Sequence, residues 1–579
     1  MSASIRSRIA SRLLFLLPLS VMARPNIIVM QPDDFEFLSE WTPPAHRPGV
    51  DVWSMDLPNI DRLRTNGIHM KRAYTTSPSC GNSRYSTMTG RYPSRSSYSR
   101  EINIGRGNEE LGFVTIPTTK LVDVDSVNDG KDCSKSNMAV LFQSNGYATG
   151  MFGKWHLFPD NPATYSYESH RNGILKCGFD TAEAVYWHNL NDSWTNGGEF
   201  SHNTEYMTKM ALDFMEKAID NEQQFFMYFN PTAPHGSGSV WEALTNLSCL
   251  DTPAGRLSEE PIIPGMTEGI GCEAYRQTVI ARANGTTTNP VLGSIWVDDA
   301  VGALLLFLES RNIVNSTIFL FQEDHGQESK FSLYEGGVRI PQFVHYPDEF
   351  PAGLVYSEIV STIDVAPTLA DLAGITANSP GWYEMDGKSW RSLPHGFDRC
   401  LMIELDYDRS VICACRKLLE IASFERSNTY TLGQTYGFET GSPAWFDLCD
   451  ANGSYLTPPN LSPEQTFANI TDSRLTDILT CHIASTRPVG DQLYGACDSL
   501  TMKEIPPPTT ELPTLPPTPP SINNSTLNPP QSSTVVTGGF VSLQDDALSS
   551  GTLVIPSGKT GWVFKTTLIL LLFRVGGLC

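Results

Sequence analysis

The sequence predicts an α/β fold, in which buried strands alternate with helices along the chain. Short apolar runs recur at intervals, the segments between them have the apolar spacing of amphipathic helices, and polar residues suited to catalysis follow each run. Ligand sites in open α/β sheets form at the carboxyl ends of strands, so these polar residues are predicted to meet at one edge of a sheet.

The predicted strands are short and strongly apolar, and the first of them is rich in β-branched residues. In chain order they are Asn26–Met30, Ala148–Phe152, Phe225–Phe229 and Ile318–Phe321. The amphipathic segments Met207–Ala218 and Ile295–Leu308 are predicted to be helices that bury one face against the sheet.

Each predicted strand leads into a short motif with titratable side chains. The motifs are Gln31-Pro32-Asp33-Asp34, Gly153-Lys154-Trp155-His156, Pro231-Thr232-Ala233-Pro234-His235 and Glu323-Asp324-His325-Gly326. Taken singly, an Asp at such a place is explained by helix capping, and a Lys or His by surface exposure. Their recurrence after four strands favours a shared functional site.

Composition limits the class of protein. The chain has 579 residues, of which 40% are hydrophobic, so it can bury a large core and form more than one domain. Its formal net charge of -22 argues against a nucleic-acid partner, because binding phosphates requires a basic surface.

The N-terminus predicts entry into the secretory pathway. Basic residues precede the apolar run Leu13–Leu19, and Ala23 ends a signal segment over residues 1–23. With Cys80 and Cys579 set aside, ten scattered cysteines remain, an even number that permits complete disulfide pairing. Glycosylation acceptors agree with an extracellular or cell-surface location, and they are Asn191, Asn246, Asn284, Asn315, Asn452, Asn460, Asn469, Asn523 and Asn524.

The C-terminal part differs in composition from the rest. Residues 501–548 include the Pro-, Thr- and Ser-rich segment Ile505–Pro530, which predicts an extended stalk. In residues 549–579, small residues, a spacer and the apolar segment Trp562–Phe573 resemble a glycolipid-anchor signal, which implies membrane attachment through the tail. Two alternatives are a single transmembrane helix, for which Leu568–Phe573 is short, and a tail without an anchor.

The segment from Cys80 to Arg91 resembles the one in which sulfatases oxidise a cysteine to formylglycine. The residues that match are Cys80, Ser83, Arg84, Thr89, Gly90 and Arg91. The segment departs from the family at Asn82, where proline is usual. The resemblance implies that a formylglycine-generating enzyme modifies Cys80 during synthesis.

The resemblance to sulfatases covers Pro25 to Ile375. Beyond the four strand-end motifs it includes Lys330, the segment Tyr334–Pro341 and the segment Ser361–Ile375. It implies an alkaline-phosphatase-like fold, with a large mixed β-sheet flanked by helices. The catalytic domain is expected over residues 24–380, and a smaller C-terminal α+β domain over residues 381–500.

The resemblance also implies a cofactor. Asp33, Asp34, Asp324 and His325 would surround a divalent cation, together with an oxygen of modified Cys80. Three carboxylates suit a hard cation such as Ca2+. His325 is a poorer ligand for calcium than a side-chain oxygen, so Mg2+ or mixed occupancy stays open.

The remaining roles follow from the chemistry of sulfate esters. Arg84, one helical turn from Cys80, is expected to hold the hydrated aldehyde, and Lys154 and Lys330 are expected to bind sulfate oxygens. His235 is expected to protonate the departing alcohol and His156 to act as the base, although the two roles can be exchanged.

Three functions stay open from the sequence. The leading one is hydrolysis of a sulfate ester of an aryl compound or a glycan, with that sulfated compound as the partner. The second is hydrolysis of phosphate or phosphonate esters on the same fold. The third is a surface protein that binds sulfated or phosphorylated glycans without turnover.

Overall fold

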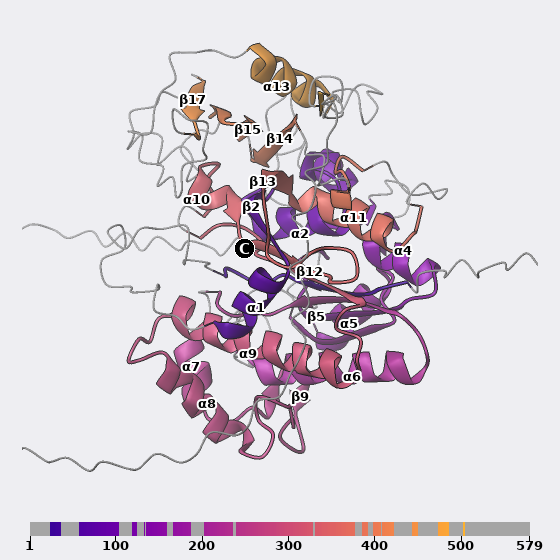
Figure 1. Cartoon of the computed structure of the whole chain (residues 1–579), viewed down its shortest axis with the longest axis vertical. Coiled ribbons are helices and arrows are strands. Elements are labelled where there is room, and N and C mark those ends of the chain that lie inside the picture. The colour runs from indigo at the N-terminus through magenta and orange to yellow at the C-terminus, as the bar shows by residue number, and fades with distance from the viewer. Residues whose placement is uncertain are drawn as a thin grey trace, which may run out of the picture. The chain divides into compact units, whose positions relative to one another are not determined.

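The computed structural model describes most of the predicted globular part (Figure 1). The described residues are 24–35, 57–102, 119–123, 132–133, 135–158, 166–186, 202–235, 239–327, 330–376, 385–391, 398–406, 408–421, 443–449, 473–485 and 502–503. The signal segment, the tail, nearly all of the stalk and the expected domain boundaries lie outside them and stay predictions. So do the acceptors Asn191, Asn452, Asn460, Asn469, Asn523 and Asn524. Asn246, Asn284 and Asn315 are exposed, as acceptors must be.

A nine-stranded mixed sheet forms the centre of the larger part of the chain. Its order is β11-β2-β12-β10-β1-β7-β5-β6, with β13 also paired to β2. Strands β10, β1, β7, β5 and β6 are parallel, whereas β12 pairs antiparallel with β10 and β2. The bounds are β1 Asn26–Met30, β2 Ile68–Tyr74, β5 Ala148–Lys154, β6 Thr181–Tyr186, β7 Phe225–Asn230, β10 Thr317–Gln322, β11 Arg339–Ile340, β12 Gln342–His345 and β13 Leu354–Ser361.

Each face of this sheet is covered by its own apolar core. Side chains alternate between the faces along a strand, so Ile28 and Met30 of β1 lie in one core and Ile27 and Val29 in the other. The first core includes helices α1 Pro58–Asn66, α6 Thr204–Asp220, α7 Val240–Thr245, α8 Gly271–Arg282 and α9 Asn289–Ser310. The second includes α2 Cys80–Thr89, α4 Met138–Ser144, α5 Tyr167–Leu175 and α11 Val365–Leu372.

Smaller elements complete this part of the chain. They are the 3-10 turns at Pro93–Arg95 and Thr362–Asp364, the helices α3 Ser97–Ile102 and α10 Glu335–Val338, and the short strands β3 Val122–Asp123, β4 Asp132–Cys133, β8 Asp251–Thr252 and β9 Gly255–Arg256. Among the described helices, α9 is the one long and apolar enough to span a bilayer. Most of its apolar stretch is buried inside the protein, as in a core helix.

The predicted elements are confirmed, with the predicted bounds for β1 and longer bounds for the others. The four expected strands are β1, β5, β7 and β10, and the two expected helices lie within α6 and α9. Strand β5 continues through Lys154, two residues beyond the predicted end. At Gly153 (φ 95°) a Cβ would lie 1.9 Å from the carbonyl oxygen of Asn230, so only glycine lets the strands approach so closely there.

The C-terminal region forms a second sheet, as the predicted smaller domain requires. Its antiparallel order is β17-β16-β15-β14-β18, and helix α13 contacts β15 and β16. The bounds are β14 Asp398–Leu405, β15 Asp408–Cys413, β16 Arg416–Glu420, β17 Ala444–Asp447, β18 Met502–Lys503 and α13 Ser473–Ser485.

Four disulfides lie within the described residues and join eight of the ten cysteines that were expected to pair, and Cys481 is disulfide-bonded as well. The bonds are Cys133–Cys177, Cys249–Cys272, Cys400–Cys413 and Cys415–Cys449. Cys80 is buried and is not part of a disulfide. This pairing is consistent with the prediction that Cys80 is modified and forms no disulfide.

Candidate active site

Three carboxylates meet at the carboxyl edge of the central sheet. Asp33 and Asp34 follow β1, and Asp324 follows the neighbouring parallel strand β10. The backbone N–H of Asp34 donates to Oδ1 of Asp324 at 3.3 Å, and Asp33 and Asp324 are both almost completely buried. The parallel register of β1 and β10 brings together groups 290 residues apart, as the strand-end argument predicted.

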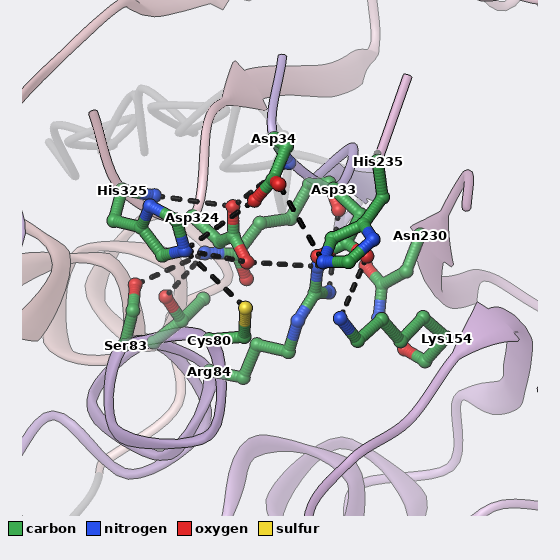
Figure 2. Close-up of polar contacts among 12 residues, drawn as sticks. Asp33, Asp34, Cys80, Ser83, Arg84, Lys154, Asn230, His235, Asp324 and His325 are labelled. Atoms are coloured by element: carbon green, nitrogen blue, oxygen red, sulfur yellow. Dashed lines mark hydrogen bonds and ion pairs between the residues drawn. The ribbon is translucent and has the colours of Figure 1, made fainter. Parts of the chain in front are cut away.

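Cys80 is the first residue of helix α2, and its thiol points into this group of carboxylates (Figure 2). Its Sγ lies 3.3 Å from Nε2 of His325, and that nitrogen lies 3.5 Å from Oδ1 of Asp34. The Cys80 side chain is fully buried. The helix N-terminus adds a positive dipole end, which favours negative charge on residue 80 or on a group bound beside it.

Arg84 projects from the same helix and bridges two of the carboxylates. Its guanidinium donates to Oδ1 of Asp33 and to Oδ2 of Asp324, each at 3.2 Å. Arg84 is fully buried, and these ion pairs compensate the cost of burying its charge. The expected contact of Arg84 with residue 80 stays a prediction.

Both predicted lysines enter the site, and each contacts a different carboxylate. Lys154 Nζ lies 2.6 Å from Oδ2 of Asp33, and Lys330 Nζ lies 2.7 Å from Oδ2 of Asp34. Nε2 of His235 lies 3.4 Å from Lys330 Nζ and 3.5 Å from Oδ2 of Asp34. Two cations and an imidazole therefore line the site beside the carboxylates.

His156 is positioned by the end of β5. It lies two residues beyond Lys154, has a φ of 57°, and its backbone carbonyl accepts a hydrogen bond from Lys120 at 3.0 Å. Its side chain is 5% exposed. Its expected role as a base rests on its place after β5 and stays a prediction.

One site residue escaped the sequence reasoning. Asn230, the last residue of β7, donates from Nδ2 to the backbone carbonyl of Lys154 at 3.0 Å and so fixes the strand end that carries the lysine (Figure 2). A polar residue that ends a buried aromatic strand, just before the motif of His235, was the available signal.

Burial and close charges change the acid–base properties of the site. Burial would raise the pKa of Asp33, but Lys154, His235 and Arg84 lower it below the usual range. Burial raises the pKa of Asp324. The pKa of His325 is raised to about 9, because Asp324 and Cys80 outweigh the lowering effect of burial. Burial lowers the pKa of His235, and its acidic neighbours offset this only in part.

The donor atoms present suit a divalent cation. Asp33, Asp34, Cys80 and His235 form one group whose ligand atoms lie within 4.8 Å of one another, and Cys80, Asp324 and His325 form another. Carboxylate oxygens dominate, which favours a hard cation, and an imidazole nitrogen is a further donor. The five residues expected from the sequence as cation ligands are thus brought together.

The fold and this site define a sulfuric ester hydrolase. Residues 25–375 match the family model described as Sulfatase, and the chain belongs to the sulfatase family. The matched range coincides with the range over which the sequence resembles that family, so the expectation is confirmed.

Characterised relatives carry sulfatase names. An N-acetylglucosamine-6-O-sulfatase of Bacteroides thetaiotaomicron is 24% identical over 424 residues, which cover 62% of this chain and 69% of that protein. An arylsulfatase of Hemicentrotus pulcherrimus is 25% identical over 397 residues, which cover 64% of this chain and 61% of that one.

Solved structures have the same fold. The crystal structure of Ps i-CgsB in complex with k-i-k-neocarrahexaose has a TM-score of 0.52 and 20% sequence identity, and the match covers 83% of this chain and 96% of that chain. The PsFucS1 sulfatase from Pseudoalteromonas sp. has a TM-score of 0.51 and 18% identity, with 81% and 92% covered.

Proposed function

We propose that this protein hydrolyses sulfate esters of carbohydrates or aryl compounds, with residue 80 converted from cysteine to formylglycine. One observation carries the proposal: Cys80 stands at the start of helix α2, directly opposite the carboxylates and His325. Membership of the sulfatase family supports this reading of the cysteine.

The chemistry of residue 80 explains why an aldehyde is useful there. A serine that accepted sulfate would remain as a stable ester. A hydrated formylglycine supplies a second hydroxyl that can expel the sulfate. Arg84, on the same face of α2 and fully buried, would hold the hydrate by charge-assisted hydrogen bonds while keeping its contacts with Asp33 and Asp324.

The proposed cation is Ca2+, with Mg2+ as the alternative. Asp33, Asp34, Asp324 and His325 would hold it together with an oxygen of residue 80. When bound, such a cation lowers the pKa of a nearby hydroxyl and offsets the negative charge of the carboxylates. The close approach of these donor atoms supports the assignment.

Lys154 and Lys330 would bind the sulfate group and stabilise charge in the transition state. Both ammonium groups contact carboxylates of the site, which supports this role. The role is electrostatic positioning, which suits the transfer of a group whose charge is spread over several oxygens.

Two histidines would move the protons. His235 has Nε2 3.4 Å from Lys330 Nζ, which supports the two groups acting together on a departing alcohol oxygen. We assign it the protonation of that alcohol. His156, beyond Lys154 on the neighbouring strand end, is assigned the removal of a proton from the hydrate when the sulfate leaves.

The proposed substrates are sulfated glycans or aryl sulfates. The relatives named above include a sulfatase of N-acetylglucosamine 6-O-sulfate and an arylsulfatase, which supports both classes. We also propose that the protein passes through the secretory pathway and acts outside the cell or attached to its surface. Within the described residues, four disulfides and three exposed glycosylation acceptors support this location.

The proposal is tested by combining mass measurement with assays. In protein purified from its natural source, the peptide that contains residue 80 should carry formylglycine. The protein should hydrolyse an aryl sulfate or a member of a panel of sulfated monosaccharides, and Cys80→Ala should abolish the activity without unfolding the protein.

Two results would count against this function. A peptide with only unmodified cysteine would remove the mechanism. Faster hydrolysis of an aryl phosphate than of the matching aryl sulfate would favour a phosphate ester hydrolase on the same fold.

A further inference from the structure

A buried chain of polar side chains runs beneath helix α2, along the strand ends that carry the carboxylates. Tyr228 donates to Oε1 of Gln31 at 2.5 Å, and Nε2 of Gln31 lies 3.4 Å from both Ser83 Oγ and Thr87 Oγ1. From the other side, Gln322 donates to Thr87 Oγ1 at 2.9 Å. All five side chains are fully buried.

These hydrogen-bonded side chains come from strands that are neighbours in the sheet. Gln342, the first residue of β12, donates to Oε1 of Gln322 at 2.7 Å, and Gln322 ends β10. Gln31 follows β1, and Tyr228 lies in β7. Strands β12, β10, β1 and β7 are neighbours in that order, so the polar chain links four adjacent strands to one helix.

Thr87 is the point where the helix joins two of these strands. Its hydroxyl oxygen accepts from Gln31 and from Gln322, which uses both of its lone pairs. Gln31 lies two residues before Asp33, and Gln322 lies two residues before Asp324. Thr87 thus contacts both segments that deliver carboxylates to the site.

Thr87 also lies on the same side of the helix as the groups of the site. Residues three, four and seven positions apart share one face of an α-helix, so Ser83, Arg84 and Thr87 lie on the face that begins with Cys80. A rotation or a slide of α2 would break the bonds to both glutamines and move Cys80 relative to Asp33 and Asp324.

We propose that Thr87 is a positioning residue for the active site. By bonding to Gln31 and Gln322 it holds the helix that carries residue 80 in register with the two strand ends that carry the cation ligands. The inference rests on the proposed function, which supplies both the divalent cation and the catalytic readout.

The physical reason is that buried polar contacts are directional. An apolar interface between helix and sheet would tolerate small shifts of α2, whereas each buried amide here loses its partner if the helix moves. Groups that orient metal ligands from behind commonly change metal affinity or activity by about 10- to 100-fold when they are removed.

The experiment compares Thr87→Val with Thr87→Ser in the full-length protein. Calcium affinity is measured by calorimetry, and kcat and KM for an aryl sulfate are measured per formylglycine-containing molecule. Valine keeps the shape but cannot accept the two bonds, so Thr87→Val should lose about 10- to 100-fold in kcat and weaken calcium binding, with a smaller change in KM. Thr87→Ser keeps the hydroxyl and should restore both values.

Thr149→Val is the matched control. Thr149 is as buried as Thr87, and its hydroxyl bonds to the carbonyl of Gly178 and to Asp180 near the other end of β5, away from the site. It should lose stability while calcium affinity and kcat stay at their wild-type values. Should Thr87→Val fail to fold, Gln322→Met cuts the same bond from the strand side and is judged by the same two measurements.

The outcomes separate this inference from the proposed function. Calcium affinity in Thr87→Val equal to that in Thr149→Val would overturn the positioning role. If the wild-type protein hydrolyses no sulfate ester, the proposed function fails, and the calcium measurement still decides for or against Thr87.

Discussion

Lys154 and Lys330 each bind one carboxylate of the site, and Arg84 binds two. The sequence identified the residues, because Arg84 belongs to the Cys80 segment, Lys154 to a strand-end motif and Lys330 to the resemblance to sulfatases. It did not identify the partners. Lys154 binds Asp33 across 121 residues and Lys330 binds Asp34 across 296 residues, and such choices depend on the register of the whole sheet.

The two lysine pairs differ in burial, which predicts different effects on stability. The side chains of Lys154 and Asp33 are 0% and 1% exposed, whereas Lys330 is 19% exposed. In protein treated with a chelator, Lys154→Met should lower the free energy of unfolding by about 3 kcal/mol, because Asp33 loses a buried partner. Lys330→Met should lower it by about 1 kcal/mol or less. Urea unfolding of both variants measures the difference, and equal losses would contradict it.

The N-terminus of helix α1 is capped by a side chain of another helix, α9. Its N-cap residue Leu57 offers no side-chain acceptor, and Asp298 in α9 takes its place. One carboxylate oxygen of Asp298 accepts from the backbone N–H groups of Asn59 and Ile60 at 3.0 and 2.8 Å. The sequence predicted the helix Ile295–Leu308 but gave no reason for its buried carboxylate, because the partner lies about 240 residues away.

This cap predicts a dependence of stability on pH. Burial raises the pKa of Asp298 from the ordinary 3.8 to about 7. Between these values the folded protein holds the proton more tightly than the unfolded chain, so the contribution of Asp298 to stability falls as pH rises through this range, by at most about 1.4 kcal/mol per pH unit.

Asp298→Asn keeps an acceptor for the α1 N–H groups but does not titrate. Its free energy of unfolding, measured with denaturant between pH 4 and 7, should therefore depend less on pH than that of wild type. The difference in slope against pH is the contribution of Asp298. Asp61→Asn, which changes an exposed residue of the same helix, should keep that slope. A slope in Asp298→Asn equal to that of wild type would show that other groups cause it.

At the scale of the whole molecule, the C-terminal sheet is attached to the catalytic part by buried polar contacts. Lys417 of β16 donates to Glu335 of α10 at 3.1 Å, and Tyr74 donates to the other oxygen of the same carboxylate at 2.8 Å. Glu404 of β14 accepts from the backbone N–H of Ser94 at 3.0 Å. Glu335 lies five residues after Lys330, so the second sheet supports the segment that brings this lysine to the site.

Removing one partner of a buried ion pair should cost more than removing both. Lys417→Met leaves the Glu335 carboxylate buried without its cation and should lower the free energy of unfolding by about 3–5 kcal/mol. The double variant Lys417→Met with Glu335→Gln should be more stable than Lys417→Met alone, because no unpaired charge remains. Lys209→Met, which breaks an exposed pair on α6, should cost about 1 kcal/mol or less.

Chemical unfolding curves of the three variants test this expectation. A double variant that is no more stable than Lys417→Met would mean that packing, and not the buried charge, holds the two parts together.

The class of fold and the core of the site were predictable, because strand-end motifs and a modification segment are local in sequence. The attachment of the second sheet was not. The match to the sulfatase family model ends at residue 375, and the contacts that attach β14 and β16 join residues 310 and 82 positions apart. Neither spacing nor composition encodes such pairs.

The disulfides of the second sheet affect how the protein would respond to a cut in its chain. Cys400–Cys413 lies directly across the paired strands β14 and β15, and Cys415–Cys449 encloses β16 and β17. A protease that cleaved anywhere between Cys415 and Cys449 would leave the two fragments covalently joined. The strands that carry Lys417 and Phe446 would stay tethered to each other until a reductant released them.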